Sequence, residues 1–140
     1  MKTFRKIILI PILFFLGMAV GTAQPAFTIA WNSNCELQST NFIYKLEYAL
    51  VYIPTMTIIQ QSPIGGLNYL SSISSTLITI ENWNCDKDDL PTDYRVFASV
   101  ARIENGGEGN ISCLGEVRSS GLRCAQLYDD LTFTVQMYYP

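Results

Sequence analysis

The sequence predicts an all-β protein, a single antiparallel β-sandwich of seven to nine strands that disulfide bonds stabilise. Three observations lead to this fold class. Apolar and polar residues alternate with period two through most of the chain, which is typical of half-buried strands. Turn-forming residues separate these stretches at intervals typical of sandwiches. Four cysteines follow a segment that resembles an export signal, and exported chains enter compartments where disulfides persist.

Residues 1–23 are predicted to be a secretory signal peptide, which leaves one domain at residues 24–140. Lys2, Arg5 and Lys6 precede an apolar run and then small residues, the usual order in such signals. The remaining chain keeps six basic and twelve acidic residues, a net charge of −6. This charge argues against nucleic acid as a partner, and the domain has no apolar run long enough to span a membrane. We therefore expect a secreted or periplasmic protein.

The first half of the domain contains three predicted strands. Large apolar residues alternate with small or polar ones over residues 27–31 and, more extensively, over 42–52. A helix over the second stretch fits less well, because it is rich in tyrosine and β-branched residues. Pro54 ends this strand, and a shorter one is expected at 55–60. Residues 62–66 are a turn by composition, with one proline and two glycines.

The second half alternates in the same way. Residues 67–83 are long enough for two strands, with a break near Ser74. A polar loop at 85–93 and a glycine-rich loop at 104–110 separate further strands. The remaining strands are expected at 94–101, 111–117, 122–127 and 131–137, and a Ser-Ser-Gly turn joins the second and third of these.

The cysteines are interpreted as structural. Cys35, Cys85, Cys113 and Cys124 allow three pairings, and the sequence alone does not choose among them. We favour Cys35 with Cys85 and Cys113 with Cys124, because the second pair flanks the predicted hairpin. A redox-active or metal-binding thiol site fits less well, because the chain has no C-x-x-C motif.

Part of the chain resembles a known family. Residues 90–100, followed by the glycine-rich segment 105–109, resemble the E–F corner, strand F and F–G loop of fibronectin type III domains. Tyr94 then corresponds to the corner tyrosine of these sandwiches. The strand that ends at Trp31 resembles their strand B with its core tryptophan. The resemblance implies an immunoglobulin-like arrangement of the sandwich.

Two acidic loops are candidate binding sites. Their carboxylates belong to Asp86, Asp88, Asp89, Asp93, Glu104 and Glu108. The three aspartates at 86, 88 and 89 have a spacing that can converge on Ca²⁺. They lack the glycine and the distal glutamate of an EF-hand, and Lys87 offsets their charge, so a solvated connection is the simpler reading. Asp93 is expected to brace the turn into the next strand. No other metal or cofactor is predicted.

Tyr44, Tyr48 and Tyr52 lie on one face of a single predicted strand. If that face is exposed, the rings form a platform for a sugar or a protein partner. If it faces the core, the rings are packing residues whose hydroxyl groups reach partners or the rim. We regard core packing as the simpler reading.

The sequence argues against catalysis. It contains no histidine, so Ser-His and Cys-His pairs are excluded, and it contains no G-x-S-x-G or S-x-x-K motif. We therefore expect a non-catalytic module that recognises a protein or a carbohydrate through its loops or an aromatic sheet face. Its acidity favours a basic partner. The alternatives are a structural or adhesive subunit that assembles by strand pairing, and a small inhibitor of an extracellular hydrolase.

Overall fold

The computed structural model describes residues 24–33, 35, 41–81, 83, 93–104 and 111–139. These residues form a β-sandwich, which confirms the predicted fold class. Its eight strands are β1 (Ala26–Ser33), β2 (Phe42–Tyr52), β3 (Thr57–Gln61), β4 (Leu67–Leu70), β5 (Ser75–Thr79), β6 (Tyr94–Glu104), β7 (Ile111–Arg118) and β8 (Leu131–Met137). Two short 3-10 helices, η1 (Ile53–Thr55) and η2 (Cys124–Tyr128), interrupt them. The predicted signal segment lies outside the described residues.

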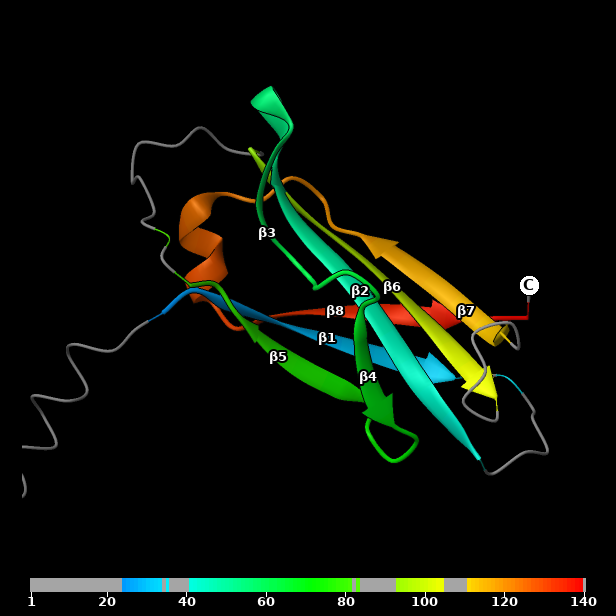
Figure 1. The fold of residues 1–140 in the computed structure, drawn as a ribbon. Helices are drawn as coiled ribbons and strands as arrows, with labels where there is room; N and C mark the ends of the chain where they lie inside the picture. Colours follow the sequence, from blue (N-terminus) through cyan, green and yellow to red (C-terminus); the bar gives the residue numbers. More distant parts are fainter. Residues whose placement is uncertain are drawn as a thin grey trace, which may run out of the picture.

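The strands form two sheets that pack face to face (Figure 1). The three-stranded sheet has the order β5-β1-β8. The five-stranded sheet has the order β3-β2-β6-β7, and β4 also pairs with β2. Neighbouring strands are antiparallel except β1 and β8, which run in the same direction. The three-stranded sheet thus combines the first and the last strand that the structure describes.

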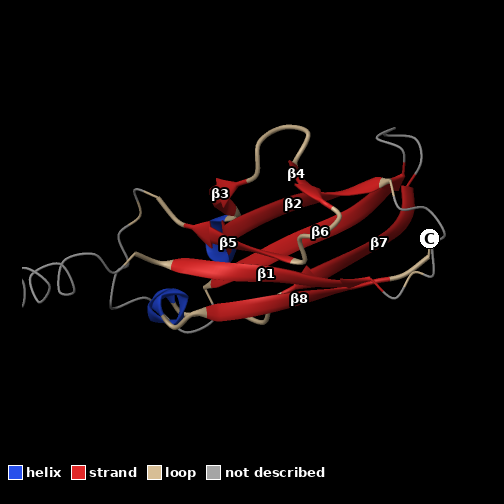
Figure 2. Cartoon of the chain, turned by 90° about the horizontal axis from the view of Figure 1, so that it is seen from below, coloured by secondary structure: helices blue, strands red, loops and turns tan. Residues whose placement is uncertain are grey.

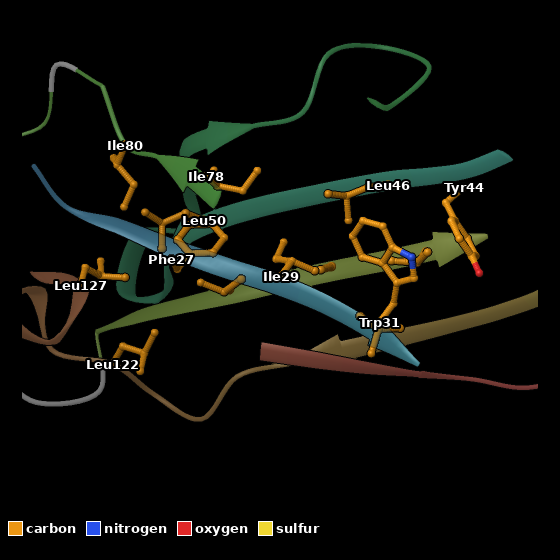
Figure 3. Packing of buried hydrophobic residues seen from close by; sticks show 14 of the residues in the cluster. Phe27, Ile29, Trp31, Tyr44, Leu46, Leu50, Ile78, Ile80, Leu122 and Leu127 are labelled. Atoms are coloured by element: carbon orange, nitrogen blue, oxygen red, sulfur yellow. The ribbon is translucent and has the colours of Figure 1, made fainter. Parts of the chain in front are cut away.

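The core lies between the sheets and follows the period-two alternation of the strands. Phe27, Ile29 and Trp31 of β1 point toward Leu46 and Leu50 of β2 (Figure 3). All five side chains are at most 3% exposed. Burial of one such large side chain contributes about 1.5–3 kcal/mol, so this layer is the main source of stability.

The tyrosines of β2 belong to this core rather than to an open platform. Tyr44 is buried and packs on Trp31, with ring centroids 5.6 Å apart. Tyr48 and Tyr52 are partly buried against the same cluster. The Tyr48 ring lies 6.0 Å from that of Phe27, and its hydroxyl accepts a hydrogen bond from the Gln60 side chain.

The predicted strand at 122–127 is wrong. After β7 the chain does not turn back as a hairpin but continues beside β6. The Ser119 N–H donates to the Val96 carbonyl, and Leu122 exchanges two backbone hydrogen bonds with Tyr94. The segment then winds into the short helix η2.

The favoured disulfide pairing is also wrong, for the same reason. Cys35 is bonded to Cys113, with Cα atoms 6.3 Å apart. Cys113 lies in β7, whereas Cys124 begins η2 beyond the extended segment that follows β7. Eleven residues of largely extended chain carry Cys124 far from Cys113. Cys124 is itself in a disulfide, and Cys85 lies outside the described residues.

Each lateral side of the sandwich has a contact between the sheets. On one side, Leu114 of β7 and Tyr138, just after β8, exchange backbone hydrogen bonds of 2.9 and 2.8 Å. On the other side, the Gln60 side chain donates to the Thr79 carbonyl and accepts from the Glu81 N–H, so it covers one end of β5. Both contacts occur where one sheet's edge strand reaches the other sheet.

Candidate functional site

The outer face of the five-stranded sheet carries an open groove of about 600 Å³. Its floor is formed by β2, β6 and β7, and the β3–β4 connection forms one wall. We call this hollow the outer groove. Ligand sites commonly have volumes of about 300–1,000 Å³, so its size is in the usual range.

The strand register arranges the floor of the outer groove in rows. Glu47 lies opposite Ser99, which in turn lies opposite Glu116. Neighbouring strands are about 4.8 Å apart, so the two glutamates start about 10 Å from each other on the same face. All three side chains are exposed. The row therefore presents a hydroxyl group with one carboxylate on each side of it.

The next row, on the side of β3, is Ala49, Phe97 and Arg118. The Arg118 guanidinium lies 5.3 Å from the centre of the Phe97 ring, a cation–π contact. Phe97 is partly buried, and Ala49 beside it is small. This end of the groove thus offers an apolar surface edged by a positive charge.

The wall of the outer groove is tied to the floor. The Ser62 N–H donates to the Tyr48 carbonyl, and the Tyr48 N–H donates to the Ser62 hydroxyl, at 3.0 and 3.1 Å. The turn closes with a hydrogen bond from the Gly66 N–H to the Pro63 carbonyl. At its tip Ile64 is fully exposed, and Figure 2 shows the connection projecting beyond the sheet. These bonds hold the wall in place while its tip is open to a partner.

A second, smaller hollow of about 230 Å³ continues the outer groove along the sheet. The two hollows share Glu47 and Ser99, and the second one extends to the apolar side chains of Ala101, Ile103 and Ile111. Lys45 borders it, with its ammonium group 3.7 Å from the Glu47 carboxylate. The groove is thus charged in the middle and apolar towards both ends.

Only part of the predicted acidic loops can be placed. Asp86, Asp88, Asp89 and Glu108, and with them the calcium hypothesis, lie outside the described residues. Asp93 is 9% exposed, and its backbone carbonyl accepts a hydrogen bond from the backbone N–H of Ile53 at 2.7 Å. The described part of the chain contains no group of three potential metal ligands.

Glu104 belongs to a buried polar cluster rather than to an open loop. Its carboxylate accepts hydrogen bonds from the Arg102 guanidinium at 2.8 Å and from the Ser112 hydroxyl at 2.9 Å. The same guanidinium lies over the Phe42 ring, 3.4 Å from its centre. Sequence reasoning missed Arg102, because a charged residue at an inward position breaks the polarity rule on which the prediction depends.

Sequence reasoning also missed the outer groove. Glu47 and Ser99 fall at outward positions of predicted strands, which the alternation does indicate. The two residues become neighbours only because β2 pairs with β6, about fifty residues away in sequence, and no local pattern shows the register of that pairing.

No protein-family model, curated protein or solved structure matches this chain. The resemblance to fibronectin type III domains therefore stays a prediction. Among the residues that the structure describes, no helix is long and apolar enough to cross a membrane.

Proposed function

We propose that this chain is an exported, non-catalytic binding module that holds its ligand in the outer groove. The observation that supports this function is the groove itself: about 600 Å³, with Glu47, Ser99 and Glu116 on its floor and a wall held by hydrogen bonds. Proteins commonly bind small ligands in concave surfaces where a few polar groups converge. The sandwich supplies a rigid floor, so little conformational entropy is lost when a ligand binds.

One feature favours binding over catalysis. The full sequence contains no histidine, the commonest general base. Export is supported by the signal-like segment 1–23 and by the disulfides, which persist in oxidising compartments.

The experiment that tests this function fills the groove. Ser99→Trp places a large ring on the floor, and Thr134→Trp places the same ring on an exposed outer position of the three-stranded sheet. Wild type and both variants are screened against an oligosaccharide array and a displayed random-peptide library. We expect ligands that bind wild type and Thr134→Trp but not Ser99→Trp. If no ligand is found, or if Ser99→Trp keeps every ligand, the proposal is wrong.

One observation favours the alternative function of assembly by strand pairing. β5 is an edge strand of five uncharged residues, and Leu77 at its centre is 64% exposed. Uncharged edges of this kind accept further strands, and natural proteins usually block them with charge. The alternative predicts oligomers in a light-scattering concentration series, and Leu77→Lys should remove them while Thr134→Lys should not. A wild-type chain that stays monomeric at high concentration contradicts the alternative.

A further inference from the structure

The outer groove and the smaller hollow form one trough along β6. They share Glu47 and Ser99, and together they extend from Phe97 to Ile103. Six residue steps at about 3.3 Å make this trough about 20 Å long. Its length fits a chain-like ligand with several units rather than a single small molecule. The inference that follows concerns the class of that ligand and therefore rests on the proposed function.

The floor of the trough offers side chains but few backbone groups. β6 pairs with β2 on one side and with β7 on the other, and β2 pairs with β6 on one side and with β3 and β4 on the other. The backbone N–H and C=O groups of β2 and β6 are therefore used in hydrogen bonds between strands. An extended peptide on this face could not add itself as a strand, the usual way in which sheets bind peptides. Its own backbone groups would depend on side-chain partners, and each buried group left without one costs about 1–3 kcal/mol. This chemistry disfavours a peptide.

The side chains of the trough suit hydroxyl groups. Glu47 and Glu116 only accept hydrogen bonds, Lys45 and Arg118 only donate them, and Ser99 does both. A hydroxyl group is both donor and acceptor, so it can use each of these partners. The two negative and two positive side chains sum to zero, which gives no electrostatic preference for an ionic ligand.

We propose that the trough binds a neutral oligosaccharide that lies along β6. Its hydroxyl groups lie between the charged side chains of β2, Lys45 and Glu47, and those of β7, Glu116 and Arg118. Phe97 and the apolar end at Ala101 and Ile111 contact the C–H faces of the sugar rings. The chain as a whole is acidic, with a net charge of −3, so uronic or sulfated sugars are repelled and bind more weakly. A basic peptide would be attracted by Glu47 and Glu116 but repelled by Lys45 and Arg118.

Affinity electrophoresis tests the inference directly. The probes are soluble neutral polysaccharides, namely a mixed-linkage β-glucan, a xylan, a galactomannan and starch, with polygalacturonate as the anionic member. We expect at least one neutral polymer to retard the wild-type protein and polygalacturonate to retard it less. Glu116→Ala should weaken binding about tenfold, since one charge-assisted hydrogen bond is lost. Asp129→Ala, which removes an exposed carboxylate outside the trough, should bind as wild type does.

The outcomes separate this inference from the function on which it rests. Retardation by a neutral polymer that Ser99→Trp abolishes and added salt leaves unchanged supports both, because a neutral ligand is not screened. If no neutral polymer retards the protein but a library peptide binds and is lost in Ser99→Trp, the carbohydrate inference is overturned and the binding function stands. If Ser99→Trp loses no ligand of either kind, both are overturned.

Discussion

Gly115 shows how one residue permits the two sheets to approach each other. It lies in β7, and a Cβ atom at this position would overlap the carbonyl group of Gln136 in β8. The neighbouring backbone hydrogen bonds between Leu114 and Tyr138 require this close approach. Glycine is needed here because it has no side chain, and not because of its backbone conformation, since its φ angle is not positive.

Gly115→Ala should destabilise the protein by about 1–3 kcal/mol, because the added methyl group meets backbone that has to move. Urea unfolding followed by tryptophan fluorescence measures the loss. Thr134→Ala, a truncation on the exposed outer face of β8, serves as the control and should change stability by less than about 0.5 kcal/mol. Equal stability of Gly115→Ala and wild type would contradict the close approach.

Residue patterns predicted burial well where polarity and position agree. Phe27, Ile29 and Trp31 were expected on one face of a strand, and all three are buried. Arg102 occupies an inward position of β6 and is 5% exposed, with its charge matched by Glu104. Such a residue cannot be predicted from its own polarity, because its burial depends on a partner and on a ring that only the fold supplies.

Gln60 acts at the scale of elements, where it joins β3 to the edge of β5. Its side-chain amide donates to the Tyr48 hydroxyl and the Thr79 carbonyl and accepts from the Glu81 N–H. Gln60→Ala should cost about 1–3 kcal/mol, since a net contribution of about 1 kcal/mol per hydrogen bond is typical. It should also speed hydrogen exchange at the Glu81 amide.

The matched control for this variant is Gln61→Ala, the same truncation at an exposed neighbour. It should leave both the free energy of unfolding and exchange at Glu81 unchanged within error. If the two variants behave alike, the side chain of Gln60 does not hold the edge of β5.

Element prediction succeeded for the strands with clear alternation and failed for the segment between β7 and β8. β2 and β8 lie where the period-two pattern placed them. The two strands expected within 67–83 are β4 and β5. Residues 122–127 instead form one bridge and a 3-10 helix, because Leu122 pairs with Tyr94 and the chain then winds up. A few apolar residues fit either structure, so tertiary pairing decides.

At the scale of the whole molecule, the arrangement of strands produces the features that the sequence did not reveal. The trough needs Glu47, Ser99 and Glu116 in one row, and Glu47 comes from β2, which is about fifty residues away in sequence from β6 and further from β7. The same is true of the disulfide, which joins residues 78 positions apart. Local patterns specify which face of a strand is buried, but they do not specify which strands are neighbours.

The disulfide connectivity is a prediction for the whole chain. With Cys35 bonded to Cys113, the one arrangement that pairs all four cysteines joins Cys85 to Cys124. Proteolysis of the oxidised protein without reduction, followed by mass spectrometry, should therefore yield these two linked peptides. A peptide that links Cys35 to Cys85 would contradict this connectivity.

The Cys35–Cys113 bond should contribute a large share of the stability, because it closes a loop of 78 residues. The chain-entropy model gives about 4.5 kcal/mol for a loop of this length, and small domains have only about 5–15 kcal/mol in total. The double variant Cys35→Ala with Cys113→Ala should therefore unfold at much lower urea concentration, with a larger m-value as its unfolded state expands.

Both cysteines are buried in the wild-type fold, so part of the loss will reflect packing. Reduction of the wild-type protein, which keeps the sulfur atoms, isolates the contribution of the cross-links. If reduction costs less than about 1 kcal/mol, the two sheets are held by their core and edge contacts alone.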